Sequence, residues 1–232
     1  MKTKYIIFAA AFFFSLFIFQ SCTKTSAEPE YEFELEAEKS ALLSQDCIVD
    51  GSLSESETEA LLFMWQEEKM AKDVYTYLYG KYQLRVFDNI SRSETIHQKA
   101  VSRLLEAYGI PLPAHDEPGT FDNPEIQDLY DNLIAIGNVS KVGGLTVGAM
   151  IEEKDILDLK NNLNESDNPW LTRVFSNLLQ ASENHLRAFN AVLKFNGTIY
   201  KPSLLNDEYF QAIISKTVTD EYRAKGYSAD RE

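Results

Sequence analysis

The chain has few cysteines and few basic residues, and both shortages exclude classes of protein. Only two cysteines, Cys22 and Cys47, occur in 232 residues, so the chain has neither a disulfide framework nor a Cys-x-x-Cys iron centre. Lysine and arginine number 22 against 36 aspartate and glutamate residues, a formal net charge of -14. Because a surface of this charge repels phosphate backbones, we expect no nucleic-acid partner.

Long apolar runs are also scarce, and the one clear example lies at the N-terminus. Residues 5–19 are almost continuously apolar after a short basic start, a run too short for a usual bilayer span and typical of a secretory signal. The run is followed by Ser21-Cys22, which resembles a bacterial lipobox with two departures from the usual motif. We expect residues 1–21 to be a lipoprotein-type signal peptide and Cys22 to carry the lipid that anchors an exported protein to the cell envelope. Ordinary signal cleavage nearby is the alternative.

The rest of the chain divides by composition into a tether, one main domain and a peripheral region. Residues 22–52 are acidic and polar without a sustained apolar period, which indicates a flexible tether. A hydrophobic content of 44% is enough for one sizeable core. We expect a helical domain over residues 53–197, then a short outer helix and a polar tail over residues 198–232.

Apolar residues recur at helical spacing in four long segments of that domain. The segments span residues 55–82, 88–108, 140–164 and 168–196. Ser54 with Glu57 three residues later forms a capping-box signature before the first of them. A Pro-rich stretch and a short helix at about residues 123–137 connect the second segment to the third. The sequence therefore predicts an all-α four-helix bundle with a long crossover between the second and third main helices.

Each of the four segments carries ionisable residues inside its apolar row. Glu94 and His97 share one helix face with apolar residues, and burying such groups is costly unless something compensates them. Carboxylates packed together repel one another, whereas two divalent ions would balance four of them. Carboxylate and imidazole ligands without thiolate favour iron or manganese, with zinc as a substitute. The predicted ligands of this two-ion site are Glu68, Glu94, His97, Glu152, Asp155 and His185.

Two neighbouring acids compete with these assignments. Glu67 and Glu153 adjoin predicted ligands, and a change in helix phase of about 100° per residue would exchange them with Glu68 and Glu152. In the favoured phase we expect Glu67 and Glu153 to be solvated. The triplet Glu-Glu-Lys occurs at 67–69 and again at 152–154, and the segments around the two predicted histidine ligands also match. This repetition suggests that two similar helical hairpins arose by duplication.

Three of the segments resemble those of rubrerythrins, which are ferritin-like proteins. The sequence EKMA from Glu68 with YTY from Tyr75 looks like their first helix, and FDNI from Phe87 with Glu94-x-x-His97 looks like their second. Glu152-x-x-Asp155 is similar to the paired acids of their third helix. Residues 53–214 resemble more closely an uncharacterised bacterial ferritin-like family.

The resemblance implies a ferritin-like fold with a di-iron carboxylate centre. Across the ferritin-like superfamily such a centre reacts with oxygen or peroxide, or oxidises ferrous iron. Because this chain has no rubredoxin domain, a complete peroxidase cycle would need an external electron donor.

One position departs from the resembled pattern. The superfamily has Glu-x-x-His on the fourth helix, but the residue three before His185 is Ser182. Asp155 could replace the lost carboxylate by bridging or chelating; otherwise the centre is asymmetric, holds one tight metal or is a degenerate remnant. Two functions therefore remain open. One is an exported di-iron protein with ferroxidase-type or peroxidase-type oxidoreductase activity, and the other is a non-catalytic helical envelope lipoprotein that binds a metal ion or a protein partner.

Overall fold

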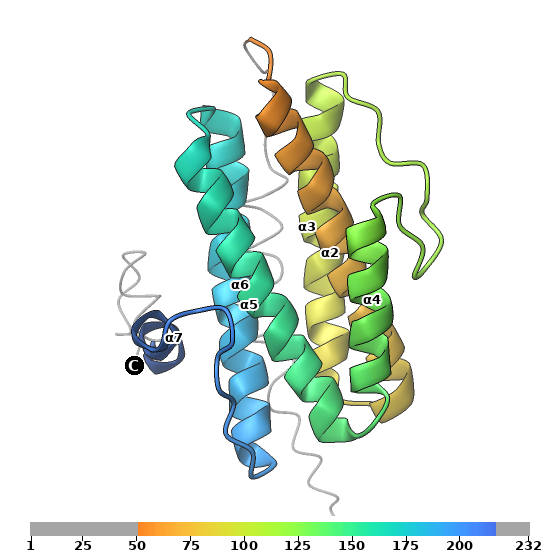
Figure 1. The fold of residues 1–232 in the computed structure, drawn as a ribbon, viewed down its shortest axis with the longest axis vertical. Helices are drawn as coiled ribbons and strands as arrows, with labels where there is room; N and C mark the ends of the chain where they lie inside the picture. Colours follow the sequence, from red (N-terminus) through yellow and green to blue (C-terminus); the bar gives the residue numbers. More distant parts are fainter. Residues whose placement is uncertain (1–50, 217–232) are drawn as a thin grey trace, which may run out of the picture.

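The computed structural model describes residues 51–216, which form six helices and no strands. Four long helices make up the bundle in Figure 1, and two shorter ones pack outside it, so the predicted all-α class is confirmed. The long helices are α2 (Glu55–Tyr82), α3 (Arg85–Ala107), α5 (Lys141–Glu165) and α6 (Pro169–Phe195). The shorter helices are α4 (Pro124–Gly137) and α7 (Asp207–Ser215).

Several sequence predictions fall outside this range. The signal peptide, the lipid site at Cys22, almost all of the tether and the polar tail from residue 217 lie beyond the described residues, so they stay predictions. Between residues 51 and 216, no helix has the length and apolar character needed to cross a membrane.

The helix ends are set mainly by local side-chain chemistry. Before α2, the Ser54 hydroxyl accepts a hydrogen bond from the Glu57 amide, and the Glu57 carboxylate accepts one from the Ser54 amide, which completes the predicted capping box. The start of α3 was expected near Asp88, but the helix begins at Arg85. Gln83 adopts a left-handed conformation with φ of 52°, which ends α2 and lets the chain turn into α3 within two residues. No side-chain hydrogen bond caps the start of α3.

The four long helices pair as two hairpins joined by a crossover. α2 pairs with α3 and α5 pairs with α6, while α2 also contacts α5 and α3 contacts α6. After α3 the chain returns along the outside of the bundle through a loop and α4, which packs on α2 and α5 (Figure 1). This return lets α5 run in the same direction as α3, which gives the long crossover predicted from the sequence.

The bundle core consists of two apolar layers with a polar layer between them. One layer is built around Tyr75, Phe87 and Phe189, and the other around Trp65 and Phe175. On α2, α3 and α6, the predicted ligands lie between the residues of one layer and those of the other. On α5, Glu152 and Asp155 lie between Ile151 and Ile156 of the first layer, ahead of Leu159 of the second. The apolar layers therefore close off both ends of the polar layer from water.

Gly148 on α5 permits a close approach between α5 and α6. A Cβ atom at this position would lie 2.4 Å from the Phe189 ring of α6, a distance that real Cβ atoms do not reach. The missing side chain therefore allows Phe189 to pack against Tyr75, with ring centroids 5.3 Å apart.

The segment after α6 is held against the bundle by Glu153, which is fully buried on α5. Its carboxylate accepts hydrogen bonds from the Tyr200 hydroxyl at 2.8 Å and from the Ser203 amide at 2.9 Å. The Ser203 hydroxyl and the Leu205 amide donate to it as well. The prediction that Glu153 is solvated is therefore wrong, because a chain segment about fifty residues later covers it.

Candidate metal centre

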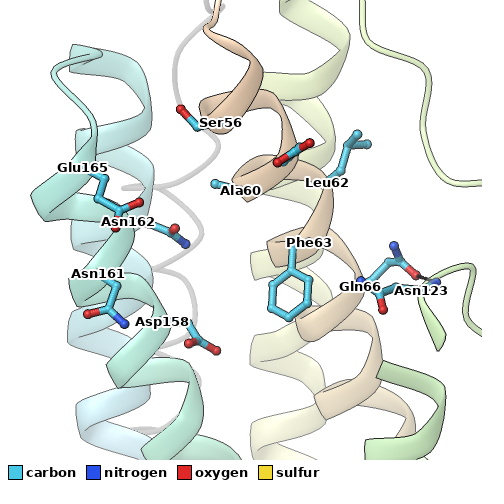
Figure 2. Close-up of a pocket in the computed structure, with 11 residues that line it drawn as sticks. Ser56, Ala60, Leu62, Phe63, Gln66, Asn123, Asp158, Asn161, Asn162 and Glu165 are labelled. Atoms are coloured by element: carbon cyan, nitrogen blue, oxygen red, sulfur yellow. Dashed lines mark hydrogen bonds between the residues drawn. The ribbon is translucent and has the colours of Figure 1, made fainter. Parts of the chain in front are cut away.

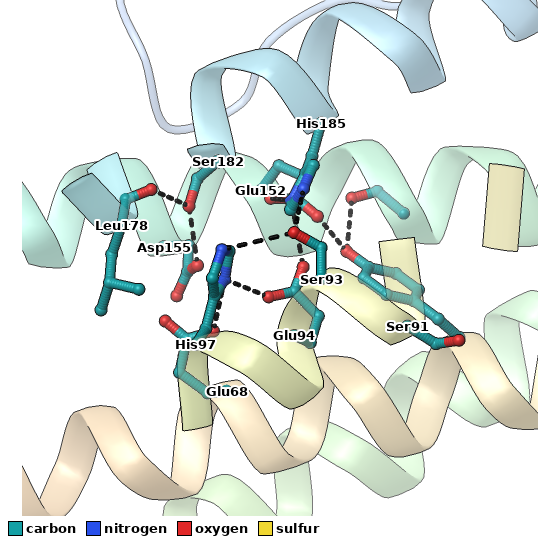
Figure 3. Close-up of polar contacts among 12 residues, drawn as sticks. Glu68, Ser91, Ser93, Glu94, His97, Glu152, Asp155, Leu178, Ser182 and His185 are labelled. Atoms are coloured by element: carbon teal, nitrogen blue, oxygen red, sulfur yellow. Dashed lines mark hydrogen bonds and ion pairs between the residues drawn. The ribbon is translucent and has the colours of Figure 1, made fainter. Parts of the chain in front are cut away.

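All six predicted ligands meet in the polar layer of the bundle. Figure 3 shows side chains from the four long helices that point toward one another at this level. Every one of them is buried, with residue exposures between 0% and 8%. The helical phase assumed from the sequence is thus the phase that the fold adopts.

The first half of the cluster comes from the α2–α3 hairpin. His97 Nδ1 lies 3.2 Å from Glu68 Oε2 and 2.6 Å from Glu94 Oε2. Each of these three residues offers one ligand atom, and the atoms all lie within 4.8 Å of one another. This spacing suits one metal ion.

The second half of the cluster comes mainly from the α5–α6 hairpin. His185 Nδ1 lies 3.0 Å from Glu94 Oε1 and 3.4 Å from Glu152 Oε2, and these three residues form a second group with the same spacing. Glu94 belongs to both groups, with Oε2 toward His97 and Oε1 toward His185. The Glu94 carboxylate is therefore placed to bridge two ions.

The cluster contains five buried donor atoms that make no hydrogen bond, although several lie within ion-pair distance of a neighbour. Such atoms are costly to bury unless something binds them, and one ion in each of the two groups would supply that binding. Oxygen and imidazole nitrogen are also the donors that iron and manganese prefer, so the residues fit a metal centre. The five atoms are Glu68 Oε1, Glu94 Oε1, Glu94 Oε2, Glu152 Oε2 and His185 Nδ1.

Burial and mutual repulsion shift the pKa values of the carboxyl groups in the cluster. Burial raises the pKa of Glu68 to about 8, against the opposing effect of His97. Burial also raises the pKa of Asp155 well above its usual range, and the charges of Glu68 and Glu152 raise it further. Burial alone would raise the pKa of Glu94, but the two histidines outweigh it and lower that pKa. The ion-free cluster therefore holds protons that bound cations would displace.

Asp155 lies in the cluster without belonging to either group of three. The Ser182 hydroxyl of α6 donates a hydrogen bond to Asp155 Oδ2 at 3.0 Å and a second to the Leu178 carbonyl. The structure thus places an α5 carboxylate against the α6 position at which the resembled pattern has glutamate. The expectation that Asp155 compensates for Ser182 as a metal ligand stays a prediction.

Two further side chains contact the cluster. Tyr75 is fully buried and donates a 2.5 Å hydrogen bond to Glu152 Oε1. Ser93 was missed; its hydroxyl lies 3.1 Å from His185 Nε2 and 3.4 Å from His97 Nε2. Its position four residues before His97 was the available signal, since such residues are helix neighbours.

The prediction that Glu67 is solvated is wrong, because Glu67 is buried with 2% exposure. Lys154 of α5 donates a 2.7 Å hydrogen bond to Glu67 Oε1.

The two Glu-Glu-Lys triplets do not occupy equivalent positions in the structure, because they differ by one residue in which glutamate faces the cluster. Alignment of the triplets pairs Glu68 with Glu153, whereas the cluster pairs Glu68 with Glu152. The triplet recurrence is therefore not support for a duplication.

Comparison with known proteins places the chain in a family. The model of the family described as "Uncharacterized protein domain (DUF2202)" matches residues 57–217. The uncharacterized protein MJ0754 of Methanocaldococcus jannaschii is 44% identical over 166 residues, which cover 71% of this chain and 90% of that protein. The crystal structure of the hypothetical protein MJ0754 is similar with a TM-score of 0.72 and 42% identity, covering 74% of this chain and 98% of that one. The family match extends beyond α6 and includes the segment held by Glu153. The chain belongs to the DUF2202 family.

Proposed function

We propose that this protein is a ferritin-like metal-binding protein whose buried cluster holds two ions, iron in the first instance, and that it has oxidoreductase capacity. The observation that carries the proposal is the convergence of five buried donor atoms without hydrogen bonds from four helices. A cluster that only stabilised the fold would be expected to satisfy these atoms internally. The ferritin-like assignment is supported by the two hairpins, the long crossover and the position of the cluster between them.

The proposed division of ligands follows the two groups of three. Glu68 and His97 would hold one ion, Glu152 and His185 would hold the other, and Glu94 would bridge them. Asp155, which lies outside both groups, would add a further carboxylate beside them. Two iron ions bound there would supply electron transfer to oxygen or peroxide, or the oxidation of further ferrous iron, and manganese or zinc could occupy the same donors.

The surrounding residues orient the ligands and control protons. Both histidines direct Nδ1 toward carboxylates and Nε2 toward the Ser93 hydroxyl, which can accept the Nε2 protons and so keep Nδ1 available as a ligand. Tyr75 holds Glu152 through its short hydrogen bond, and Ser182 holds Asp155. The apolar layers on either side exclude bulk water from the cluster.

We also propose that the protein is exported and anchored at Cys22. Support for this comes from the N-terminal sequence pattern alone. Labelling of the expressed protein with a radioactive fatty acid, with Cys22→Ser as the control, tests the anchor directly.

Elemental analysis of the protein purified without chelator tests the metal centre. We expect about two ions of iron or manganese per chain, since four carboxylates balance two divalent charges. Glu94→Gln should lose both ions, because Glu94 belongs to both groups. Glu106→Gln is the matched control, since it makes the same change on an exposed position of α3 and should retain the wild-type metal content.

Oxidoreductase capacity is tested separately by adding oxygen or peroxide to the protein loaded with ferrous iron. An absorbance change that requires Glu94 would support the enzyme. Bound metal without any such change would leave a storage or binding protein. Wild-type protein that binds no metal, and whose thermal stability is unchanged by Glu94→Gln, would overturn the metal centre and favour a non-catalytic helical module.

A further inference from the structure

A groove of about 620 Å³ lies between the N-terminal half of α2 and the C-terminal half of α5. Figure 2 shows Phe63 on α2 and Asp158 on α5 on facing sides of it. Its lining residues include Glu59 and Glu165 as well as several amides, but no lysine or arginine. Such a lining attracts cations rather than anions.

Lys154 connects this groove to the interior of the bundle. Its ammonium group donates hydrogen bonds to Asp158, which lines the groove, and to Glu67, which is buried on α2. The ammonium also lies 5.1 Å from the centre of the Phe63 ring. The side chain of Lys154 is 31% exposed and that of Glu67 only 2%. The ammonium therefore stands between the groove and the buried carboxylate.

Glu67 has a buried oxygen that no group of the described chain satisfies. Its Oε1 accepts the hydrogen bond from Lys154, but its Oε2 has no hydrogen-bond partner. Along the chain, Glu67 directly precedes the cluster residue Glu68, and Lys154 directly precedes the cluster residue Asp155. The groove residue Asp158 and the buried Glu67 therefore share the Lys154 ammonium beside the residues of the cluster.

We propose that divalent cations reach the buried cluster from this groove by way of Glu67, and that the Lys154 ammonium blocks the route until a cation replaces it. This inference rests on the proposed metal centre. Glu67 would hold the passing cation through Oε2, while Lys154 swings toward solvent, as its partial exposure permits. A divalent ion then replaces one ammonium beside the two carboxylates of Glu67 and Asp158, so no carboxylate is left without a counter-charge.

The rate of Co²⁺ loading into metal-free protein tests this route. Stopped-flow absorbance follows binding, and elemental analysis measures the ions bound at equilibrium. Glu67→Gln should slow loading by about tenfold, because the attraction along the route is lost, and should leave the final content unchanged. Lys154→Met should accelerate loading several-fold, about as much as charge removal changes other steered encounters. Glu106→Gln and Lys99→Met make the same changes at exposed positions of α3 and should load at the wild-type rate.

The opposite signs separate the proposal from structural damage. If the two substitutions merely loosened the α2–α5 interface, both would accelerate loading, and the route would be overturned. Wild-type rates in Glu67→Gln would likewise overturn it, because cations would then enter elsewhere. In both cases a normal final metal content would leave the metal centre intact. A wild-type protein that takes up no Co²⁺ at equilibrium would overturn the centre and the route together.

Discussion

The α2–α3 and α5–α6 hairpins contribute to one cluster with different ligand sets. The α2–α3 hairpin supplies Glu68 and the Glu94-x-x-His97 pair. The α5–α6 hairpin has Ser182 at the position equivalent to Glu94, and its second acid, Asp155, comes from α5 instead. The comparison teaches that the two hairpins supply their second polar group differently: α3 places a carboxylate at Glu94, whereas α6 places the Ser182 hydroxyl, which donates a hydrogen bond to an α5 carboxylate.

The acids next to the cluster differ between the hairpins as well. Glu153 accepts hydrogen bonds from Tyr200, Ser203 and Leu205, and so anchors the C-terminal segment. Glu67 has a single partner, Lys154, and one oxygen without a hydrogen bond. The fully bonded acid stabilises the fold, whereas the partly bonded one is suited to exchange partners.

The largest change in metal content among these predictions is expected when either histidine is removed. We expect His97→Ala to lose the ion of the first group and His185→Ala to lose the ion of the second, because each histidine belongs to one group only. Each variant should then retain about one ion per chain, and the double variant none. Elemental analysis decides this, and loss of both ions in either single variant would show that the groups are not independent.

A smaller loss is expected for Asp155→Asn. Metal affinity should fall roughly 10- to 100-fold, the range found when a residue that supports a metal site is removed. The combination Asp155→Asn with Ser182→Glu should restore affinity, because it returns the carboxylate to α6. Titration with Co²⁺ monitored by absorbance measures both. A double variant no better than Asp155→Asn would contradict the exchange of roles between these positions.

Glycines in the two hairpins should respond differently to alanine. Gly148→Ala on α5 would place a Cβ 2.4 Å from the Phe189 ring and should destabilise the protein by about 1–3 kcal/mol through overpacking. Gly80→Ala on α2 meets nothing within 4 Å, so it should stabilise by roughly 0.5–1 kcal/mol through helix propensity. Urea denaturation of the two variants measures the free energies of unfolding. Equal effects would refute the close contact between α5 and α6.

A further expected effect is a pH dependence of the metal-free protein. The folded-state pKa of Glu68, about 8, lies above its ordinary value of 4.5, so between these pH values the folded state binds more protons than the unfolded state. The stability associated with Glu68 is therefore present below pH 4.5 and is lost as the pH rises through about 8. Thermal melts in EDTA should show a steeper decline in wild type than in Glu68→Gln. Parallel declines would remove Glu68 as the cause.

The helices and the face that each one buries could be predicted from the sequence. The apolar rows around Glu68, Glu94 and His185 follow the helical period, which is a local property of the chain, and the structure buries these residues as expected. The start of α3 could not be placed, because the left-handed turn at Gln83 has no sequence signature of its own. A helix cap formed by side-chain hydrogen bonds can be recognised in the sequence, whereas a cap formed by backbone conformation alone cannot.

The sequence by itself determined the number of long helices, the crossover and the set of six ionisable residues that face inward. Tertiary structure alone decided the partners of the residues beside them. Glu67 and Glu153 were expected in solvent because the helical period shows only that they lie outside the main apolar row of their helices. They are buried because Lys154 and the segment after α6 pack over them. Helical period is fixed by neighbours three and four residues away, but burial beside the row depends on which distant segment covers it.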